Sequence, residues 1–220
     1  MPPSGALPVY VEVGRRRCFA AAVDWPGWCR SGIGEDGALT TLIAYRARYR
    51  KALGPAARGL PDPRSVADLE VVERVGGGSG TEFGTPGVVP DLDRRPVGGS
   101  ELRRLLRILE ACWSSFDRAA RAAAGVELAK GPRGGGRDLA KMKAHMAEGD
   151  SGYLGAVGGR FPGDARSDPT GLRAAFVDAV EARARGELPD FGPRGGARWP
   201  ARYAVRRAAW HALDHAWEIE

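Results

Sequence analysis

The segment from Pro200 to the C-terminus constrains the fold more than any other part of the chain. It is predicted to be a helix, and at about 100° per residue four ionisable side chains fall on one narrow stripe: His211, Asp214, His215 and Glu218. The other faces are almost entirely apolar: Ala209, Trp210, Ala212, Leu213, Ala216 and Trp217. Such a helix is expected to be buried on most sides, so its ionisable stripe should face the interior of a helical bundle.

Buried imidazoles need partners, and one metal ion can satisfy several of them. His211 and His215 are one helical turn apart, a spacing that lets both bind one ion. The only other histidine, His145, lies on an earlier predicted helix beside an apolar stripe. The alternative is a pair of structural histidines, hydrogen-bonded to carboxylates of their own helix. We favour one divalent ion held by His145, His211 and His215.

Three carboxylates are expected to orient the imidazoles of this site: Asp214, Glu218 and Glu148. Imidazole ligands suit several metals, so zinc or nickel is expected, with iron and copper left open. The ligand set alone does not decide between them.

Helical periodicity extends over the whole C-terminal half. Helices are predicted near residues 100–124, 138–153, 170–185 and 200–220, with apolar residues at helical spacing in the first of them. Four helices in this length are typical of an up-and-down bundle, which we assign to residues 100–220.

The N-terminal third has a different pattern. Strands are predicted over residues 8–13, 17–23 and 69–75, and one helix over residues 35–53, which gives a ββαβ module in residues 1–75 and an α+β fold class for the chain. Trp25 and Trp28, in the turn after the second strand, are expected to be core or interface aromatics, with a ligand patch as the alternative. Residues 76–99 are rich in glycine and proline and form either a linker or an ordered flap.

Composition narrows the possible partners. The net charge of +6 would suit nucleic acid, but the basic residues are mostly arginine, are spread over the whole chain, and accompany the Ala, Gly and Pro bias of GC-rich coding. These features argue against a nucleic-acid partner without excluding one. No apolar run has membrane-spanning length and no signal peptide is visible, so we expect a cytoplasmic protein without a membrane partner. The three cysteines are expected to be buried free thiols: Cys18, Cys29 and Cys112.

A short arginine-rich motif occurs twice. Gly131-Pro132-Arg133-Gly134-Gly135-Gly136-Arg137 recurs as Gly192-Pro193-Arg194-Gly195-Gly196-Ala197-Arg198, each time just before a histidine-bearing helix. Glycine lets backbone N–H groups turn toward an anion, and arginine binds carboxylate or phosphate in a bidentate way. An anion- or substrate-binding role is one interpretation of Arg133, Arg137, Arg194 and Arg198, and two hydrophilic loops produced by GC-rich coding are the other.

The histidine-bearing helices resemble those of the DinB-like superfamily, in Lys143-Ala144-His145-Met146-Ala147-Glu148 and in the run from Arg206 to Trp217. The resemblance covers residues 100–220. It implies a four-helix bundle, a divalent metal on three histidines, often a homodimer, and chemistry of the mycothiol- and bacillithiol-dependent transferases and isomerases. Residues 155–170 lack recognisable contacts, so the family's substrate pocket is not carried over.

Residues 8–75 resemble HicB-like domains in the tyrosine strand, the hairpin, the Asp24-Trp25-Pro26-Gly27 turn and the helix that follows. The family's usual Gly-Asp/Asn-Thr step before the helix is not intact here. The resemblance implies a generic binding or oligomerising module, in a family that includes antitoxins.

The sequence thus favours a metal-dependent S-transferase or isomerase that acts on a low-molecular-weight thiol and an electrophile. Two alternatives remain: a non-catalytic metal-binding sensor, and an antitoxin-like, DNA-associated regulator acting through the N-terminal module. A closed site with four ligands would favour the sensor, and a basic face on the sheet would favour the regulator.

Overall fold

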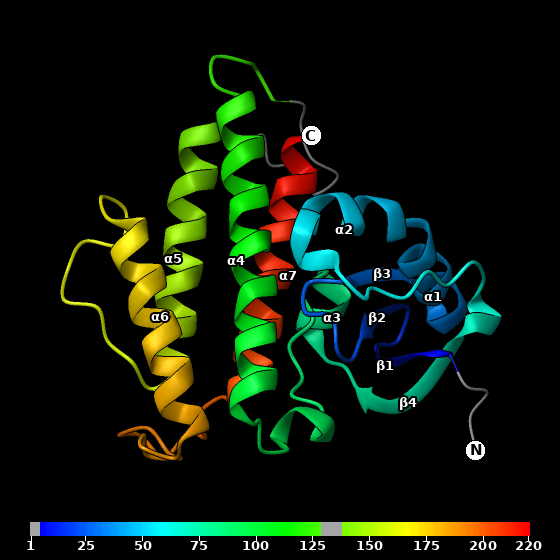
Figure 1. Cartoon of the computed structure of the whole chain (residues 1–220), viewed down its shortest axis with the longest axis horizontal. Helices are drawn as coiled ribbons and strands as arrows, with labels where there is room; N and C mark the ends of the chain where they lie inside the picture. The colour runs from blue at the N-terminus through cyan, green and yellow to red at the C-terminus, as the bar shows by residue number, and fades with distance from the viewer. Residues whose placement is uncertain (1–4, 129–137) are drawn as a thin grey trace. The chain divides into compact units, whose positions relative to one another are not determined.

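The structure, a computed structural model, describes residues 5–128 and 138–220. The chain is a mixed α+β protein, with a four-stranded sheet near the N-terminus followed by helices (Figure 1), as the sequence predicts. It divides into two compact units, Met1–Arg95 and Pro96–Glu220, which are called the sheet unit and the helical unit below.

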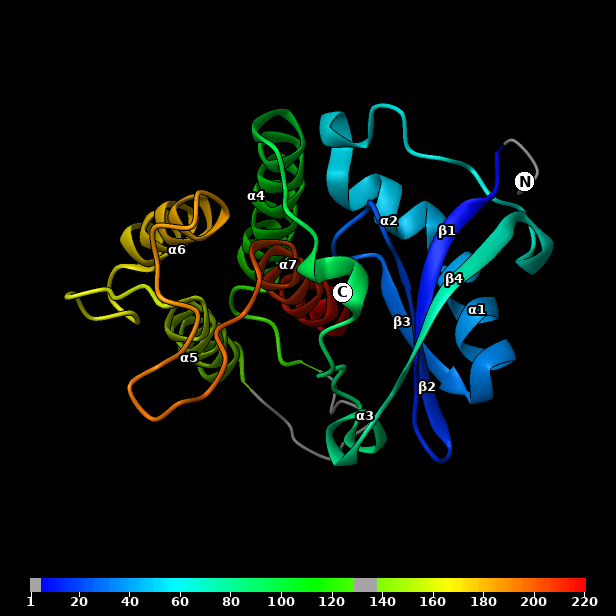
Figure 2. The ribbon, with the colours of Figure 1, turned by 90° about the horizontal axis from the view of Figure 1, so that it is seen from below.

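The sheet has the strand order β3-β2-β1-β4. Its strands are β1 (Leu7–Val13), β2 (Arg17–Ala22), β3 (Cys29–Ile33) and β4 (Leu69–Gly76). β1 and β3 each pair antiparallel with β2, whereas β4 pairs parallel with β1. A parallel pair needs a crossover connection, which α1 (Gly34–Ala44), α2 (Arg46–Leu53) and two short 3₁₀ turns provide. Figure 2 shows α1 beside the sheet.

β3 is a strand that the sequence did not predict, and its absence from the expected ββαβ order is an error of that prediction. The segment Cys29–Ile33 contains serine and glycine and has no apolar alternation, so only its pairing with β2 makes it a strand. Gly32 also has a packing role, because any side chain there would overlap the backbone of Gly37 and Ala38 in α1. The strand and the helix therefore approach closely at this glycine.

The single helix predicted over residues 35–53 is wrong as well, because it is interrupted at Tyr45. The separate α2 brings Tyr49 onto Trp28, with ring centroids 5.2 Å apart, and the Tyr49 hydroxyl donates to the carbonyl of Pro26. The indole N–H of Trp28 donates to the carbonyl of Leu42 at 2.9 Å. Trp28 is fully buried, so this aromatic belongs to the core of the sheet unit.

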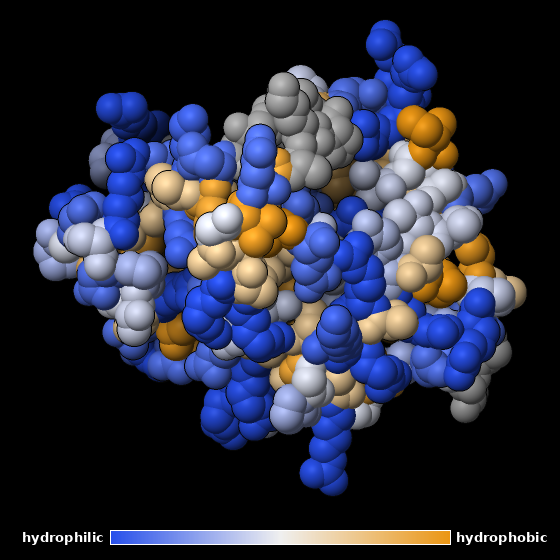
Figure 3. Space-filling model, turned by 90° about the horizontal axis from the view of Figure 1, so that it is seen from above, coloured by the Kyte–Doolittle hydropathy of each residue, from blue (hydrophilic) through white to orange (hydrophobic). Residues whose placement is uncertain are grey.

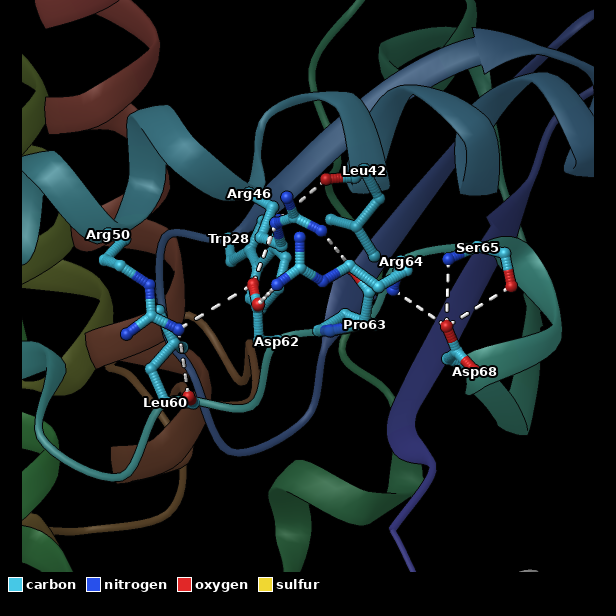
Figure 4. A network of polar contacts seen from close by, with 10 residues as sticks. All are labelled: Trp28, Leu42, Arg46, Arg50, Leu60, Asp62, Pro63, Arg64, Ser65 and Asp68. Carbon is cyan, nitrogen blue, oxygen red and sulfur yellow. Dashed lines mark hydrogen bonds and ion pairs between the residues drawn. The ribbon is translucent and has the colours of Figure 1, made fainter.

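The connection after α2 is ordered by ion pairs around Asp62. In Figure 4 the guanidinium groups of Arg46, Arg50 and Arg64 surround this carboxylate, with Arg46 Nε 3.0 Å from Oδ1. Arg46 also donates to the carbonyl of Pro63 at 2.8 Å. These groups are partly exposed, so they fix the path of the chain more than they stabilise the fold.

The glycine- and proline-rich segment after β4 is ordered against the sheet. Its first part forms α3 (Ser79–Phe83). The carboxylate of Glu12, fully buried in β1, accepts hydrogen bonds from the Thr81 hydroxyl and from the backbone N–H groups of Gly87 and Val88, both at 3.0 Å. These hydrogen bonds hold the first part of the segment against β1, and the sheet unit extends to Arg95.

The helical unit contains α4 (Gly99–Ala122), α5 (Leu139–Val157), α6 (Pro169–Ala184) and α7 (Ala201–Ile219), which lie side by side (Figures 1 and 2). α7 contacts each of the other three helices, and fifteen of its nineteen residues are buried. α5 runs four residues beyond its predicted end, because Gly155 stays helical and the left-handed Gly158 (φ 105°) terminates it.

All three cysteines are buried and none of them forms a disulfide, as predicted. None of the helices in the described part of the chain combines the length and the hydrophobicity needed to cross a bilayer. Only a few large apolar side chains are exposed, and on the face in Figure 3 they form small groups within a mostly hydrophilic surface.

The Glu12 cluster yields a stability prediction. Glu12→Gln removes the charge from a buried acceptor of several hydrogen bonds, so the free energy of unfolding should fall by about 1.5–3 kcal/mol in chemical denaturation. Limited proteolysis within residues 77–90 should become faster. Glu127→Gln, at an exposed position, is the control and should change neither quantity. Unchanged stability of Glu12→Gln would show that the segment is ordered by other contacts.

Candidate metal centre

The three histidines of the chain converge between two helices of the helical unit. α7 carries His211 and His215 one turn apart, and α5 carries His145 opposite them. Their candidate ligand nitrogens all lie within 4.8 Å of one another, and the Nε2 atoms of His145 and His211 are 3.2 Å apart. The predicted ligands are therefore close enough to bind one metal ion.

The cluster is enclosed on the α7 side and more open on the α5 side. His211 and His215 are 5% and 6% exposed, whereas His145 is half-buried. The ring centroids are 4.7–5.0 Å apart, so protonation of more than one imidazole would place like charges in contact. A divalent cation is the partner that suits three neutral imidazoles at this separation.

Glu218 sets the orientation of one ligand. Its carboxylate lies 2.8 Å from Nδ1 of His215, one turn earlier on α7. The Nδ1–H group donates to the carboxylate, which leaves the Nε2 lone pair of His215 available to a metal. Glu218 thus contacts a predicted ligand in the way expected of an orienting carboxylate.

Asp214 and Glu148 are the other two carboxylates expected near the site. Asp214 is half-buried on α7, between the two histidines. Glu148 is more than half exposed, and its described polar contact is an ion pair with Arg166 rather than with a histidine. The sequence places Glu148 within one turn of His145 but does not show where its carboxylate points.

A glycine and a tyrosine of α5 form the wall against His211. Any side chain at position 149 would overlap the His211 ring, so Gly149 permits the close approach of α5 and α7. The Tyr153 ring meets the same imidazole edge-on at 5.4 Å. Burial raises the pKa of Tyr153, and nearby Arg207 opposes this shift, so the phenol keeps its proton at neutral pH.

Arg207 is a buried residue near the histidine cluster that the sequence reasoning did not single out. It lies one turn before His211 on α7 and is only 9% exposed. Its guanidinium lies over the rings of Trp210 and Tyr153, at 4.4 and 5.4 Å from their centroids. Its Nη1 atom makes no hydrogen bond to any described residue. The detectable signal was spacing, because positions 207, 211 and 215 share one face of the helix.

The predicted arginine loops are described only in part. Arg133 and Arg137 lie outside the described residues. Arg194 is exposed, and Arg198 donates to the carbonyl of Gly155 near the C-terminus of α5. Gly155 follows His145 by ten residues, or about 15 Å along the helix axis. The described contact of Arg198 therefore holds the end of α5, and the anion-binding role of these loops stays a prediction.

Comparisons of the chain with protein-family models, with curated proteins and with solved structures found no match. The geometry of the histidine cluster and its surroundings is therefore the basis for any functional proposal.

Glu218 and Glu148 allow a matched test of whether a carboxylate beside a histidine supports metal binding. Glu218→Gln should lower metal affinity roughly 10- to 100-fold, because the hydrogen bond that orients His215 is weakened. Glu148→Gln is the control on α5 and should leave the affinity unchanged. Competition against a chromogenic chelator measures both. Equal affinities for the two variants would mean that Glu218 does not support the metal site.

Proposed function

We propose that the helical unit is a metal-dependent enzyme that acts on a low-molecular-weight thiol, as an S-transferase or isomerase. The observation that carries the proposal is the convergence of His145, His211 and His215 within ligand distance, with His145 half-buried. A site closed to solvent on every side would suit a purely structural metal instead.

Three neutral imidazoles preserve the full charge of a divalent ion and leave it coordination positions for a substrate. Zinc or nickel fits this ligand set, and iron or copper is compatible with it. When bound, the ion supplies Lewis acidity that lowers the pKa of a thiol, so that a nucleophilic thiolate exists at neutral pH.

Arg207 supplies the site with a buried positive charge. Because its Nη1 atom has a free hydrogen-bond donor at low exposure, it is suited to the acid group of the thiol or of the electrophilic co-substrate. The aromatic rings of Trp210 and Tyr153 fix the guanidinium plane by stacking. Arg207 thereby takes the role that the sequence suggested for the arginine loops.

The resemblance of residues 100–220 to the DinB-like superfamily supports the same reaction class and the same metal ligands. The HicB-like resemblance of the first third adds a binding or oligomerising module. A homodimer is compatible with both resemblances.

The proposal is tested with the cobalt-substituted protein, titrated with 3-mercaptopropionate and 2-mercaptoethanol. Both thiols should produce thiolate-to-cobalt charge-transfer absorption, and the acidic thiol should bind more tightly. Arg207→Gln should weaken only the acidic thiol, roughly 10- to 100-fold, because one charge-assisted hydrogen bond is lost. Arg107→Gln, at an exposed position of α4, is the control.

Cobalt content and melting temperature of each variant show that the site and the fold are intact. Absence of the charge-transfer band with either thiol would contradict thiol chemistry and favour a metal-binding sensor. A band with equal affinity for both thiols, unmoved by Arg207→Gln, would remove Arg207 from the site.

A further inference from the structure

The helical unit contains a cavity of about 490 Å³ between α4, α5 and α6. The apolar part of its lining includes Phe116, Ala120 and Met146. The volume is within the range of small-molecule sites. None of the three histidines lines it, because α5 turns His145 toward α7 and presents Met146 and Asp150 to the cavity.

The buried end of the cavity carries a carboxyl group with an unused oxygen. Asp150 is only 3% exposed, and its Oδ1 atom makes no hydrogen bond to a described residue. Its Oδ2 atom lies 3.7 Å from Nε of Arg173, whose terminal nitrogens bind Asp117 at 2.7 and 3.1 Å. A buried polar atom without a hydrogen bond is unfavourable, and a ligand hydroxyl in the cavity is one group that would relieve it.

Burial raises the pKa of Asp150 to about 7. Arg173 on α6 and Trp113 on α4 oppose this shift, and the charge of Asp117 adds to it. Near neutral pH the carboxyl group can therefore accept a hydrogen bond or donate one.

The exposed end of the cavity is cationic. Arg121 and Lys143 line it, and neither has an ion pair within the described residues. The other two cations in the lining are already paired, Arg166 with Glu148 and Arg173 with Asp117. Two uncompensated positive charges at the mouth favour an anionic ligand.

We propose that this cavity binds a small hydroxylated organic acid. Its carboxylate lies between Arg121 and Lys143, its apolar body packs against Phe116 and Met146, and its hydroxyl group hydrogen-bonds to Oδ1 of Asp150. The proposal does not depend on thiol chemistry or on metal binding.

The test is calorimetric titration of the full chain with 4-hydroxyphenylacetate. Phenylacetate, which lacks the hydroxyl, should bind about tenfold more weakly, because one buried hydrogen bond is lost. Tyramine replaces the carboxylate with an ammonium group and should bind at least tenfold more weakly. Tyramine binding as tight as that of the acid would overturn the proposal.

Variants locate the binding in the cavity. Lys143→Gln should weaken 4-hydroxyphenylacetate several-fold, whereas Lys141→Gln, which lies outside the cavity, should not. Asp150→Leu should abolish the preference over phenylacetate. Ala120→Leu fills part of the cavity and should weaken both acids without altering the charges. Melting temperatures confirm that each variant is folded, and unchanged binding by folded Ala120→Leu would contradict the site.

Removal of metal with a chelator separates this site from the metal centre. The affinity for 4-hydroxyphenylacetate should be the same in the metal-loaded and metal-free protein. Loss of binding on metal removal would place the acid at the histidines and overturn the cavity proposal. Failure of the thiol titration would leave this result unaffected.

Discussion

Helix α7 is packed against α4, α5 and α6, and this burial governs what its side chains can do. The stripe of Arg207, His211 and His215 lies inside the helical unit because the other faces are apolar. Polar groups removed from water require partners. His145 contacts His211, and Glu218 accepts a hydrogen bond from His215. A metal ion would bind the remaining nitrogen lone pairs of the three imidazoles.

Much of this could be predicted from the sequence. The apolar faces of α7 indicated its burial, and the spacing of three histidines indicated one site, because helical periodicity is a strong local signal. β3 and the break at Tyr45 could not be predicted, since both depend on contacts between distant segments. Tertiary packing also decides which helix each face of α5 contacts. The sequence could therefore not predict that Oδ1 of Asp150 is buried without a hydrogen bond to a described residue.

α5 contributes to both the histidine cluster and the cavity of the helical unit, through different faces. One face presents His145 and Gly149 to α7, and the other presents Asp150 to the cavity. Buried ionisable groups such as Arg207 and Asp150 reduce stability unless they are well paired. The proposed ligands, an acid group at Arg207 and a hydroxyl group at Asp150, would supply the partners that these two buried groups lack among the described residues.

The most direct test of the central claim is the metal content of the full chain, purified without a histidine tag. Elemental analysis should find one divalent ion per chain. Each of the single variants His145→Ala, His211→Ala and His215→Ala should lose stoichiometric metal while remaining helical by circular dichroism, because each removes one of three ligands. A folded variant that keeps a full complement of metal with unchanged affinity would contradict the three-histidine site.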